Sequence, residues 1–531
     1  MRKKFFTFVI LFSVALPITI ALRDIFSGSI PFWYDPARDL LLALDNLRKP
    51  TLIGPPTGIP GLFYGPYWLW LLSLILLVSR DPRFITLFVQ ALPYLILFPL
   101  LLSKFGKDIF GKIWILLWLF FFISYKPYIT SLWNPNLVPL FFLVLLYLVT
   151  KVDMKIKNLK ILFAMGFVNG LMVNFHVSFS LGIFIGLILF ITINMFVNRC
   201  HCDPPTGGEV AAKAGSRCGG TIPTVKTKNL RDRHAHTSLA MTMILSLFKS
   251  YFFLFSGLLL TFVPFFLFEI RHGFMQIQSL SKTFFFATFY HSAVVGQTGL
   301  KPYQIVSEFF SVPSTLLHTS NNVIALFSFL IIIALYFKLK EKKLSFQDKE
   351  EKLLLFLFLC TTSVLFVFLS SKNPVWSYHF IGVEIIFILL IGILANKINW
   401  LKYLLIIWII VLGFSETRNI LSSLNRNPYT VPSLVTKEYI VDTIYRDAGN
   451  TPFSVNVYSP AIYTFDFDYL FKWKQNSVLL LDSKTIYLII PDTKESVRKD
   501  FINYKTPDKI YSTIKTWQIP DGTWIVKRVR K

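Results

Sequence analysis

Long apolar segments separated by short polar loops make up most of the chain. Runs of roughly 18 or more apolar residues with few charges recur over residues 1–414, and each is about long enough to cross ~30 Å of hydrocarbon as a helix. The pattern predicts a polytopic α-helical membrane protein with about ten to thirteen transmembrane helices. The first run, residues 5–22, lacks a small-residue cleavage site and is followed by many others, so we interpret it as a retained anchor.

The pattern changes after residue 414, where long apolar runs end. Residues 415–531 predict a small α/β domain, with helical spacing and a glycine stop in residues 439–449. Asp466 and Asp468 alternate with aromatic residues in "TFDFDYLFKW", which we interpret as a solvated strand edge. Strand composition is found in three further segments, residues 453–459, 485–491 and 523–530.

The composition agrees with a membrane location. The chain of 531 residues is 54% hydrophobic and 16% charged, which leaves too much apolar surface for a water-soluble globule. A net charge of +25 would suggest nucleic acid in a soluble protein, but here many lysines and arginines lie in short loops, where they set membrane orientation. We therefore expect the lipid bilayer as a partner and no nucleic acid.

The basic loops predict which side each segment faces. Because such loops stay in the cytoplasm, we expect a multi-pass protein of the plasma membrane with a cytoplasmic N-terminus and an extracytoplasmic C-terminal domain. The loops assigned to the inside are residues 2–4, 151–160, 338–352 and 397–402 and the stretch after Arg199.

One part of the chain does not fit this scheme. Residues 80–83 and residues 104–112 both look cytoplasmic, although a single apolar span with Pro93 in its middle separates them. Either that span is a re-entrant pair of short helices, or one of the two basic loops lies outside.

Residues 199–238 form an unusual insert. They contain no aromatic residue and are rich in glycine, proline, threonine and basic residues, which predicts a disordered cytoplasmic loop. Its cysteines and histidines are of the types that bind zinc, but their spacing matches no ligand pattern we can justify, so composition favours an insertion without metal. These residues are Cys200, Cys202, Cys218, His234 and His236.

The remaining loops collect polar and ionisable side chains on the predicted outer side, as a site at a membrane boundary would. Asp35 follows Phe32, Trp33 and Tyr34, which suit headgroup depth, and partial desolvation there favours a general base. The alternative is an interfacial charge, or a cap on a short helix over residues 37–47. The outer loops hold Asp35, Arg38 and Asp39, residues 133–136, Asn174 and His176, residues 269–272 and residues 377–379.

Residues 52–74 combine glycines and prolines with an aromatic-headed apolar run. Glycine and proline here predict a tight loop that brings backbone close to whatever binds above it. Taken alone, the segment is better explained by a turn followed by an interfacial aromatic belt.

In this order, six segments resemble the bacterial branch of the protein O-mannosyltransferase family, also described as aminoarabinose-transferase-like glycosyltransferases of the GT-C class. The segments are "FWYDPARDLLLALDNL" (32–47), "LIGPPTGIPGLFYGPYW" (52–68), "LWNPNLVPLF" (132–141), "NGLMVNFHVSFS" (169–180), "FEIRHGF" (268–274) and "WSYHFIGVEIIFIL" (376–389). The resemblance covers residues 5 to about 414 and, more loosely, the tail.

The resemblance implies an inverting transfer of one sugar from a polyprenyl-phosphate donor to a protein, glycan or lipid acceptor on the outer face. Asp35 would be the base, and no cofactor is implied beyond a possible divalent cation. A cation must stabilise the leaving phosphate, for which Arg38, Arg271, His272 and His379 are candidates. Asn174 and His176 would contact sugar or acceptor, and Asp39 would hold Arg38.

Each of these residues also has a structural interpretation. In the structural interpretation, an internal ion pair and a helix end account for Glu269, Arg271 and His272. His379 then makes an interfacial hydrogen bond. Residues 133–136 would cap a helix. Many relatives carry an arginine where this chain has Thr130, so phosphate contact from that loop is not expected.

A transporter or flippase of lipid-linked saccharides is the alternative function. Alternating access favours midplane charges and internal repeats, whereas the ionisable groups here gather at loop ends and no repeat is found. A membrane-anchored protein whose tail is the active part is a third possibility, but it needs far fewer spans.

Overall fold

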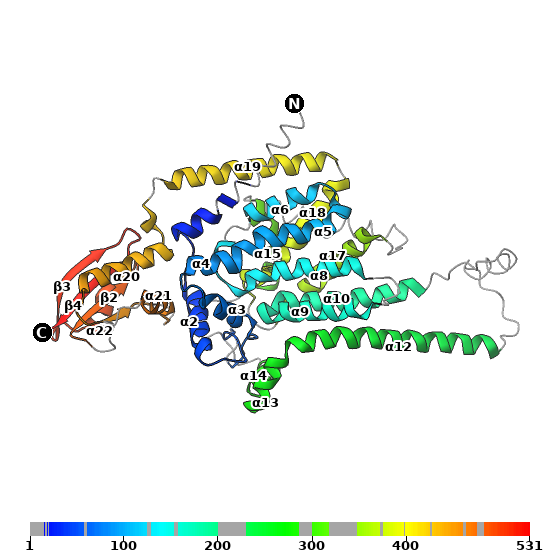
Figure 1. The fold of residues 1–531 in the computed structure, drawn as a ribbon, viewed down its shortest axis with the longest axis horizontal. Helices are drawn as coiled ribbons and strands as arrows, with labels where there is room; N and C mark the ends of the chain where they lie inside the picture. Colours follow the sequence, from blue (N-terminus) through cyan, green and yellow to red (C-terminus); the bar gives the residue numbers. More distant parts are fainter. Residues whose placement is uncertain are drawn as a thin grey trace.

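The structure, a computed structural model, is a bundle of membrane-spanning helices with a small sheet domain beyond one end (Figure 1). Six of its helices are long and apolar enough to cross a membrane, and four shorter apolar helices accompany them, within the part of the chain that is described. The prediction of a polytopic α-helical membrane protein with a C-terminal α/β domain is confirmed. The described residues are 15, 18–19, 21–57, 61–124, 129–152, 158–199, 230–285, 300–317, 348–371, 375–397, 399–424, 427–459, 463–474 and 483–531.

The first half of the chain supplies the helices from α2 to α10. These are α2 (Tyr34–Arg48), α3 (Tyr67–Leu76), α4 (Pro82–Thr86), the π-helical η1 (Leu87–Ala91) and η2 (Pro93–Leu97), α5 (Phe98–Phe110), α6 (Ile113–Ser124), the 3-10 turn η3 (Asn134–Leu137), α8 (Val138–Lys151), α9 (Leu159–Phe175) and α10 (Val177–Arg199). Most of the expected anchor, residues 5–22, lies outside the described residues.

The second half of the bundle contains α12 (Leu230–Thr261), α13 (Val263–Arg271), α14 (Met275–Phe285), α15 (Pro302–Leu317), α17 (Lys349–Ser370), the 3-10 turn η4 (Ser377–Phe380), α18 (Val383–Lys397) and α19 (Asn399–Leu424). Helix α12 begins at Leu230, so residues 230–238 of the expected insert are helical rather than disordered. That stretch contains no glycine or proline, the residues that end helices most often. The three cysteines of the insert lie outside the described residues.

Glycines let helices α9 and α12 pack closely. A Cβ on Gly166 would lie 1.9 Å from the Leu254 carbonyl oxygen, and one on Gly257 would lie 2.0 Å from the Phe163 carbonyl oxygen, so α9 and α12 touch backbone to backbone. In a bilayer, such close approach supplies the van der Waals contact that water cannot drive.

The segment that did not fit the orientation scheme is one continuous helical rod, Pro82–Phe110. Pro93 is accommodated by the π-helical turns η1 and η2, because a wider turn tolerates the missing amide hydrogen. Near its end the rod carries Asp108, which pairs with Lys349, whereas Arg83 at its beginning pairs with Glu438 of the tail. The re-entrant alternative is therefore wrong, and the two basic loops lie at opposite ends of one span.

The tail forms a four-stranded sheet in the order β1-β2-β4-β3, with β1 parallel to β2 and the other pairs antiparallel. All three predicted strands are confirmed, and residues 439–449 form the end of the predicted helix, α20, which stops before Gly449 (φ +55°). The elements after α19 are the 3-10 turn η5 (Pro428–Thr430), α20 (Leu434–Ala448), β1 (Phe453–Val457), α21 (Phe465–Lys474), β2 (Thr485–Ile490), α22 (Glu495–Lys505), β3 (Tyr511–Gln518) and β4 (Trp524–Arg530).

One prediction for the tail is wrong. Residues Phe465–Lys474 form helix α21 rather than a strand edge. Phe467, Leu470 and Phe471 are buried, and their spacing of three and four is helical, which outweighs the shorter alternation around Asp466 and Asp468. Both aspartates lie in the first turn, where the helix dipole stabilises a negative charge.

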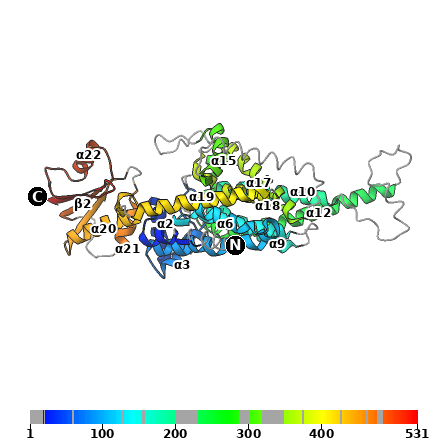
Figure 2. The same ribbon diagram turned by 90° about the horizontal axis from the view of Figure 1, so that it is seen from above.

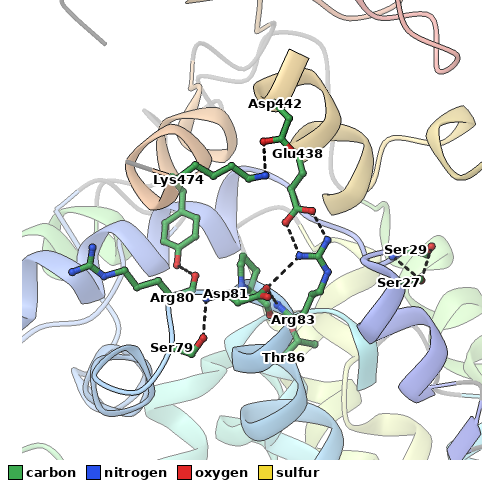
Figure 3. Close-up of polar contacts among 12 residues, drawn as sticks. Ser27, Ser29, Ser79, Arg80, Asp81, Arg83, Thr86, Glu438, Asp442 and Lys474 are labelled. Atoms are coloured by element: carbon green, nitrogen blue, oxygen red, sulfur yellow. Dashed lines mark hydrogen bonds and ion pairs between the residues drawn. The ribbon is translucent and has the colours of Figure 1, made fainter. Parts of the chain in front are cut away.

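The sheet domain is attached to the bundle at the end that carries α2 (Figures 1 and 2). The amides of Leu434 and Val435 donate to the carbonyls of Ile30 and Gly28, so the start of α20 joins the loop before α2. Figure 3 shows the ion pair beneath this contact, in which both terminal nitrogens of Arg83 reach Glu438 while Asp81 accepts from Arg83 at 3.5 Å.

Candidate active site

Helix α2 presents the first candidate group, Asp35, Arg38 and Asp39. Trp33 occupies the N-cap position without a side-chain cap bond, and Asp35 lies inside the first turn. The helix over residues 37–47 therefore exists, but Asp35 is not its cap. Ala37, Leu40 and Leu44 are buried at helical spacing. They fix the rotation of the helix and hence the direction of its charged residues.

Arg38 lies between two carboxylates. Its Nη1 is 2.8 Å from Asp35 Oδ1, while its Nε and Nη2 donate to Asp39 Oδ1 at 2.9 and 2.8 Å. The planar guanidinium suits this arrangement because its donors point in fixed directions. The expectation that Asp39 holds Arg38 agrees with this geometry.

Asp39 is fully buried, unlike Asp35. Its second oxygen, Oδ2, accepts a hydrogen bond of 2.8 Å from the indole nitrogen of Trp68, which is itself buried at the start of α3. Burial raises the pKa of the Asp39 carboxyl to about 6, although Arg38 and Trp68 act in the opposite direction. The side chain of Asp35 retains 17% of its exposure, so the two acids differ sharply in their access to ligands.

Aromatic side chains from separate loops surround the Asp35–Arg38 pair. The Trp33 ring lies 6.1 Å from that of Trp133, which lies 5.6 Å from the ring of Tyr378. On the other side, Tyr34 stacks with Tyr463 of the tail at 6.2 Å. The structure thus brings four segments far apart in sequence to one place.

Three tyrosines near the Asp35–Arg38 pair have raised pKa values. The pKa of Tyr378 is raised to about 12, by burial and by the neighbouring Tyr34 and Asp35. Burial also raises the pKa values of Tyr34 and Tyr64, with Asp35 adding to the effect in both. All three phenols therefore stay protonated near neutral pH and can donate a hydrogen bond to a ligand.

The glycine-rich loop positions Tyr64. Gly54 donates to the Tyr64 carbonyl at 2.7 Å and Tyr64 donates to Pro55 at 3.0 Å, which closes a small hairpin. A Cβ on Gly54 would lie 2.2 Å from the Gly65 carbonyl oxygen, so only glycine allows this approach. The prediction of a tight loop close to the site is consistent with this packing.

Asn174 packs against the same glycine-rich loop. Its side-chain nitrogen donates to the Gly170 carbonyl at 2.7 Å, and its oxygen packs directly over Gly65. In the structure Asn174 is thus a support for the glycine-rich loop.

Two histidines lie next to the aromatic group, with ring centroids 6.2 Å apart. His379 accepts from the Trp376 amide through Nδ1 at 3.0 Å, and burial lowers the pKa of His379 to about 4. A neutral imidazole is a hydrogen-bonding group and a poor partner for phosphate charge. His176 is buried and lies against the backbone of Tyr378.

Glu269, Arg271 and His272 occupy a separate place at the turn between α13 and α14. The buried Glu269 carboxylate accepts the amides of Gln276 and Ile277 at 3.1 Å each, so it caps α14. His272 stacks on Phe268 and binds its carbonyl, and Arg271 is exposed. In the described part of the chain none of the three contacts Asp35 or Arg38.

Trp133, Asn134 and Asn136 have structural contacts as well. Asn134 donates to the Phe175 carbonyl at 2.9 Å, which ties this loop to the α9–α10 junction. Asn136 donates to the Ser131 carbonyl at 2.9 Å. The loop thereby holds Trp133 against Trp33 and Tyr378.

The donors around Asp35 do not suit a divalent cation. Ca²⁺ and Mg²⁺ prefer several oxygen ligands, of which carboxylates are the strongest. Within the described residues no three acidic, histidine or cysteine side chains come together, and Arg38 occupies the space between the two carboxylates here.

Sequence reasoning missed two side chains of this site. Trp68 was part of an apparent aromatic belt, and its indole N–H bond to Asp39 has no local signal. Tyr463 belongs to the tail, where it is 55% exposed and carries no motif. Both reach the site through long-range packing.

Comparisons with known proteins were made against family models, curated proteins and solved structures. No family model matches, and neither does any curated protein. Among solved structures, the chain is similar to the crystal structure of the oligosaccharyltransferase of Archaeoglobus fulgidus in complex with Zn and sulfate, with a TM-score of 0.45 and 11% identity over 98% of this chain and 72% of that one. At this score the likeness carries no inference about chemistry. The resemblance to the mannosyltransferase-like family stays a prediction.

Proposed function

We propose that the protein is a glycosyltransferase that moves one sugar from a polyprenyl-phosphate donor to an acceptor hydroxyl at the membrane surface. The proposal is supported above all by the Asp35–Arg38 ion pair, which joins an acid and a cation at the domain end of the membrane-spanning bundle. An apolar carrier reaches such a place through the bilayer, while its polar head meets the loops.

Asp35 and Arg38 have different roles in the proposed reaction. The Asp35 carboxylate accepts the proton of the acceptor hydroxyl as its oxygen bonds to the anomeric carbon. The bond between that carbon and the phosphate oxygen breaks, and its electron pair leaves with the polyprenyl phosphate. Arg38 stabilises the negative charge of that phosphate. Attack from the face opposite the phosphate inverts the anomeric configuration.

The surrounding rings suit a sugar. Trp33, Tyr34 and Tyr378 offer flat apolar faces with polar edges, which match the mixed surface of a pyranose. His176 and His379 supply neutral hydrogen-bonding groups to its hydroxyls. Asp39 positions Arg38, and we assign Asn174 and Glu269 to the support of the loops.

The test is a pair of matched substitutions on α2. Membranes containing each variant are supplied with radiolabelled polyprenyl-phosphate sugars one at a time, and labelled product is followed. Asp35→Asn should lower transfer about 100-fold or more, because the amide keeps the shape but cannot accept the proton. Asp45→Asn, on the same helix and 66% exposed, is the control and should retain activity. Transfer at the wild-type rate in Asp35→Asn would refute the assignment.

A further inference from the structure

The charges on α2 do not balance. One guanidinium, Arg38, faces two carboxylates within 3 Å, and no other cation contacts Asp35 or Asp39 in the described residues. A phosphate arriving at Arg38 would add further negative charge to the same guanidinium. Like charges this close oppose each other, so one carboxylate must give way.

The two carboxylates are not equally able to leave. Asp39 is fully buried and is held by Trp68 as well as by two nitrogens of Arg38, so moving it would strand a charge without partners. Asp35 is part exposed and shares a single guanidinium nitrogen, at 2.8 Å. Asp35 can regain contact with solvent when it leaves the guanidinium, so breaking this pair costs less than leaving the fully buried Asp39 without a partner.

We propose that Arg38 exchanges Asp35 for the donor phosphate while it stays anchored to Asp39. In the resting state Arg38 holds Asp35 and keeps its carboxylate paired. When the donor binds, Nη1 turns to the phosphate and Asp35 is released as a base. Asp39 and Trp68 are positioning residues in this scheme, and the base becomes available when there is a sugar to transfer. The inference rests on the proposed function and assigns an order to it: donor first, acceptor second.

The scheme gives neighbouring acids opposite effects on phosphate binding. The probe is farnesyl phosphate, titrated into the detergent-purified full chain at a fixed pH above 7, with farnesol as the phosphate-free reference. Asp35→Asn removes the competitor for Arg38 and should tighten phosphate binding about threefold to fivefold. Asp39→Asn removes the charged anchor and should weaken it about tenfold. Asp45→Asn should leave it unchanged.

A double-mutant cycle and thermal unfolding keep the test valid when a single variant folds poorly. Lysine cannot bridge the two carboxylates as the guanidinium does, so Arg38→Lys should weaken phosphate binding and abolish the gain from Asp35→Asn. Trp68→Phe keeps the ring but removes the bond to Asp39, and should weaken binding to a smaller extent than Asp39→Asn. Thermal unfolding of each variant separates loss of fold from loss of binding.

The results distinguish this proposal from the proposed function. If Asp35→Asn binds farnesyl phosphate more tightly but still transfers sugar, the exchange holds and the base assignment fails. If Asp35→Asn abolishes transfer while its phosphate binding is unchanged or weaker, the base stands and the exchange is overturned. Equal effects of Asp35→Asn and Asp39→Asn would also overturn the exchange.

Discussion

Arg38 and Arg83 lie at the same end of the bundle, and each contacts two carboxylates. Arg38 has partners one and three residues away on its own helix, and one of them, Asp35, is partly open to solvent. Arg83 reaches Glu438, 355 residues further along the chain, through both terminal nitrogens. In our proposal the first pair exchanges a partner without disturbing the fold, whereas the second pair joins two parts of the fold. If the proposal is right, an arginine between carboxylates binds a ligand in one place and attaches the tail in the other.

The largest expected effect separates the two arginines by activity. Arg38→Gln should lower sugar transfer about 100-fold to 1000-fold, because the charge that stabilises the leaving phosphate is lost. Arg83→Gln should leave turnover per folded molecule close to wild type. Radiolabel transfer, normalised to folded protein by size-exclusion chromatography, checks both. Equal losses in the two variants would remove the distinction.

The next effect is expected at Arg83 and not at Arg38, and it concerns attachment of the tail to the bundle. Arg83→Gln leaves the Glu438 carboxylate, 9% exposed, without its charged partner and should cost about 2–3 kcal/mol of the free energy that holds the tail. Limited proteolysis near residues 425–433 should become faster. Adding Glu438→Gln should restore much of the loss, and no recovery would mean that the pair is not the attachment.

A smaller effect is expected at Gly28, which packs on Arg83. Its φ of +73° favours glycine, and a Cβ there would lie 2.7 Å from Arg83 Nη2. Gly28→Ala should cost more unfolding free energy than the ~1–2 kcal/mol that a positive φ alone costs, because the new Cβ also meets Arg83. Chemical denaturation measures it, with Gly273→Ala as a control, since Gly273 also has positive φ but has nothing within 4 Å of a Cβ. A matching loss at Gly273 would assign the cost to the backbone alone.

A pH dependence of severalfold is expected for phosphate binding at Arg38. The folded pKa of Asp39 is raised from 3.8 to about 6, so the folded protein holds this proton more tightly than the unfolded chain. Asp39 therefore makes the unfolding free energy fall as pH rises from about 4 to about 6. Below about 6 the anchor of Arg38 is neutral, and binding of a phosphodiester donor should weaken as pH falls from 7 to 5. A profile unchanged in Asp39→Asn would contradict this.

The smallest effect is expected at Lys472, which reaches Asp45 at 3.4 Å across the same interface. Asp45 is 66% exposed and Lys472 is 38% exposed, so Lys472→Ala should change tail attachment by about 0.5 kcal/mol or less. The proteolysis assay used for Arg83 gives the comparison. A loss as large as that of Arg83→Gln would show that charge count, rather than burial, holds the tail.

Local spacing in the sequence predicted part of the site. Asp35, Arg38 and Asp39 stand within five residues, and a helix brings such neighbours together whatever surrounds it. The glycine-rich loop was predicted for a similar reason, since Gly54 and Gly65 allow the close approach that the hairpin shows. Glu269, Arg271 and His272 looked equally suitable in sequence, but in the structure Glu269 caps a helix.

Other features had no local signal. Pro93 suggested a broken span, but in the structure π-helical turns accommodate the proline within one continuous helix. Asp466 and Asp468 suggested a strand because alternation over a few residues outweighed the longer helical spacing of Phe467, Leu470 and Phe471. In both cases tertiary packing chose between two local conformations of similar cost.

The sequence by itself determined the membrane location, the α/β tail and the charged cluster on one short helix, because hydrophobic length, strand composition and helical spacing act over short distances. The tertiary structure decided that Asp39 is buried beneath Trp68 while Asp35 stays partly open, and that Arg83 meets Glu438. Burial depends on segments that lie far away in the chain, so the difference between an exchangeable partner and a fixed one appears when the chain has folded.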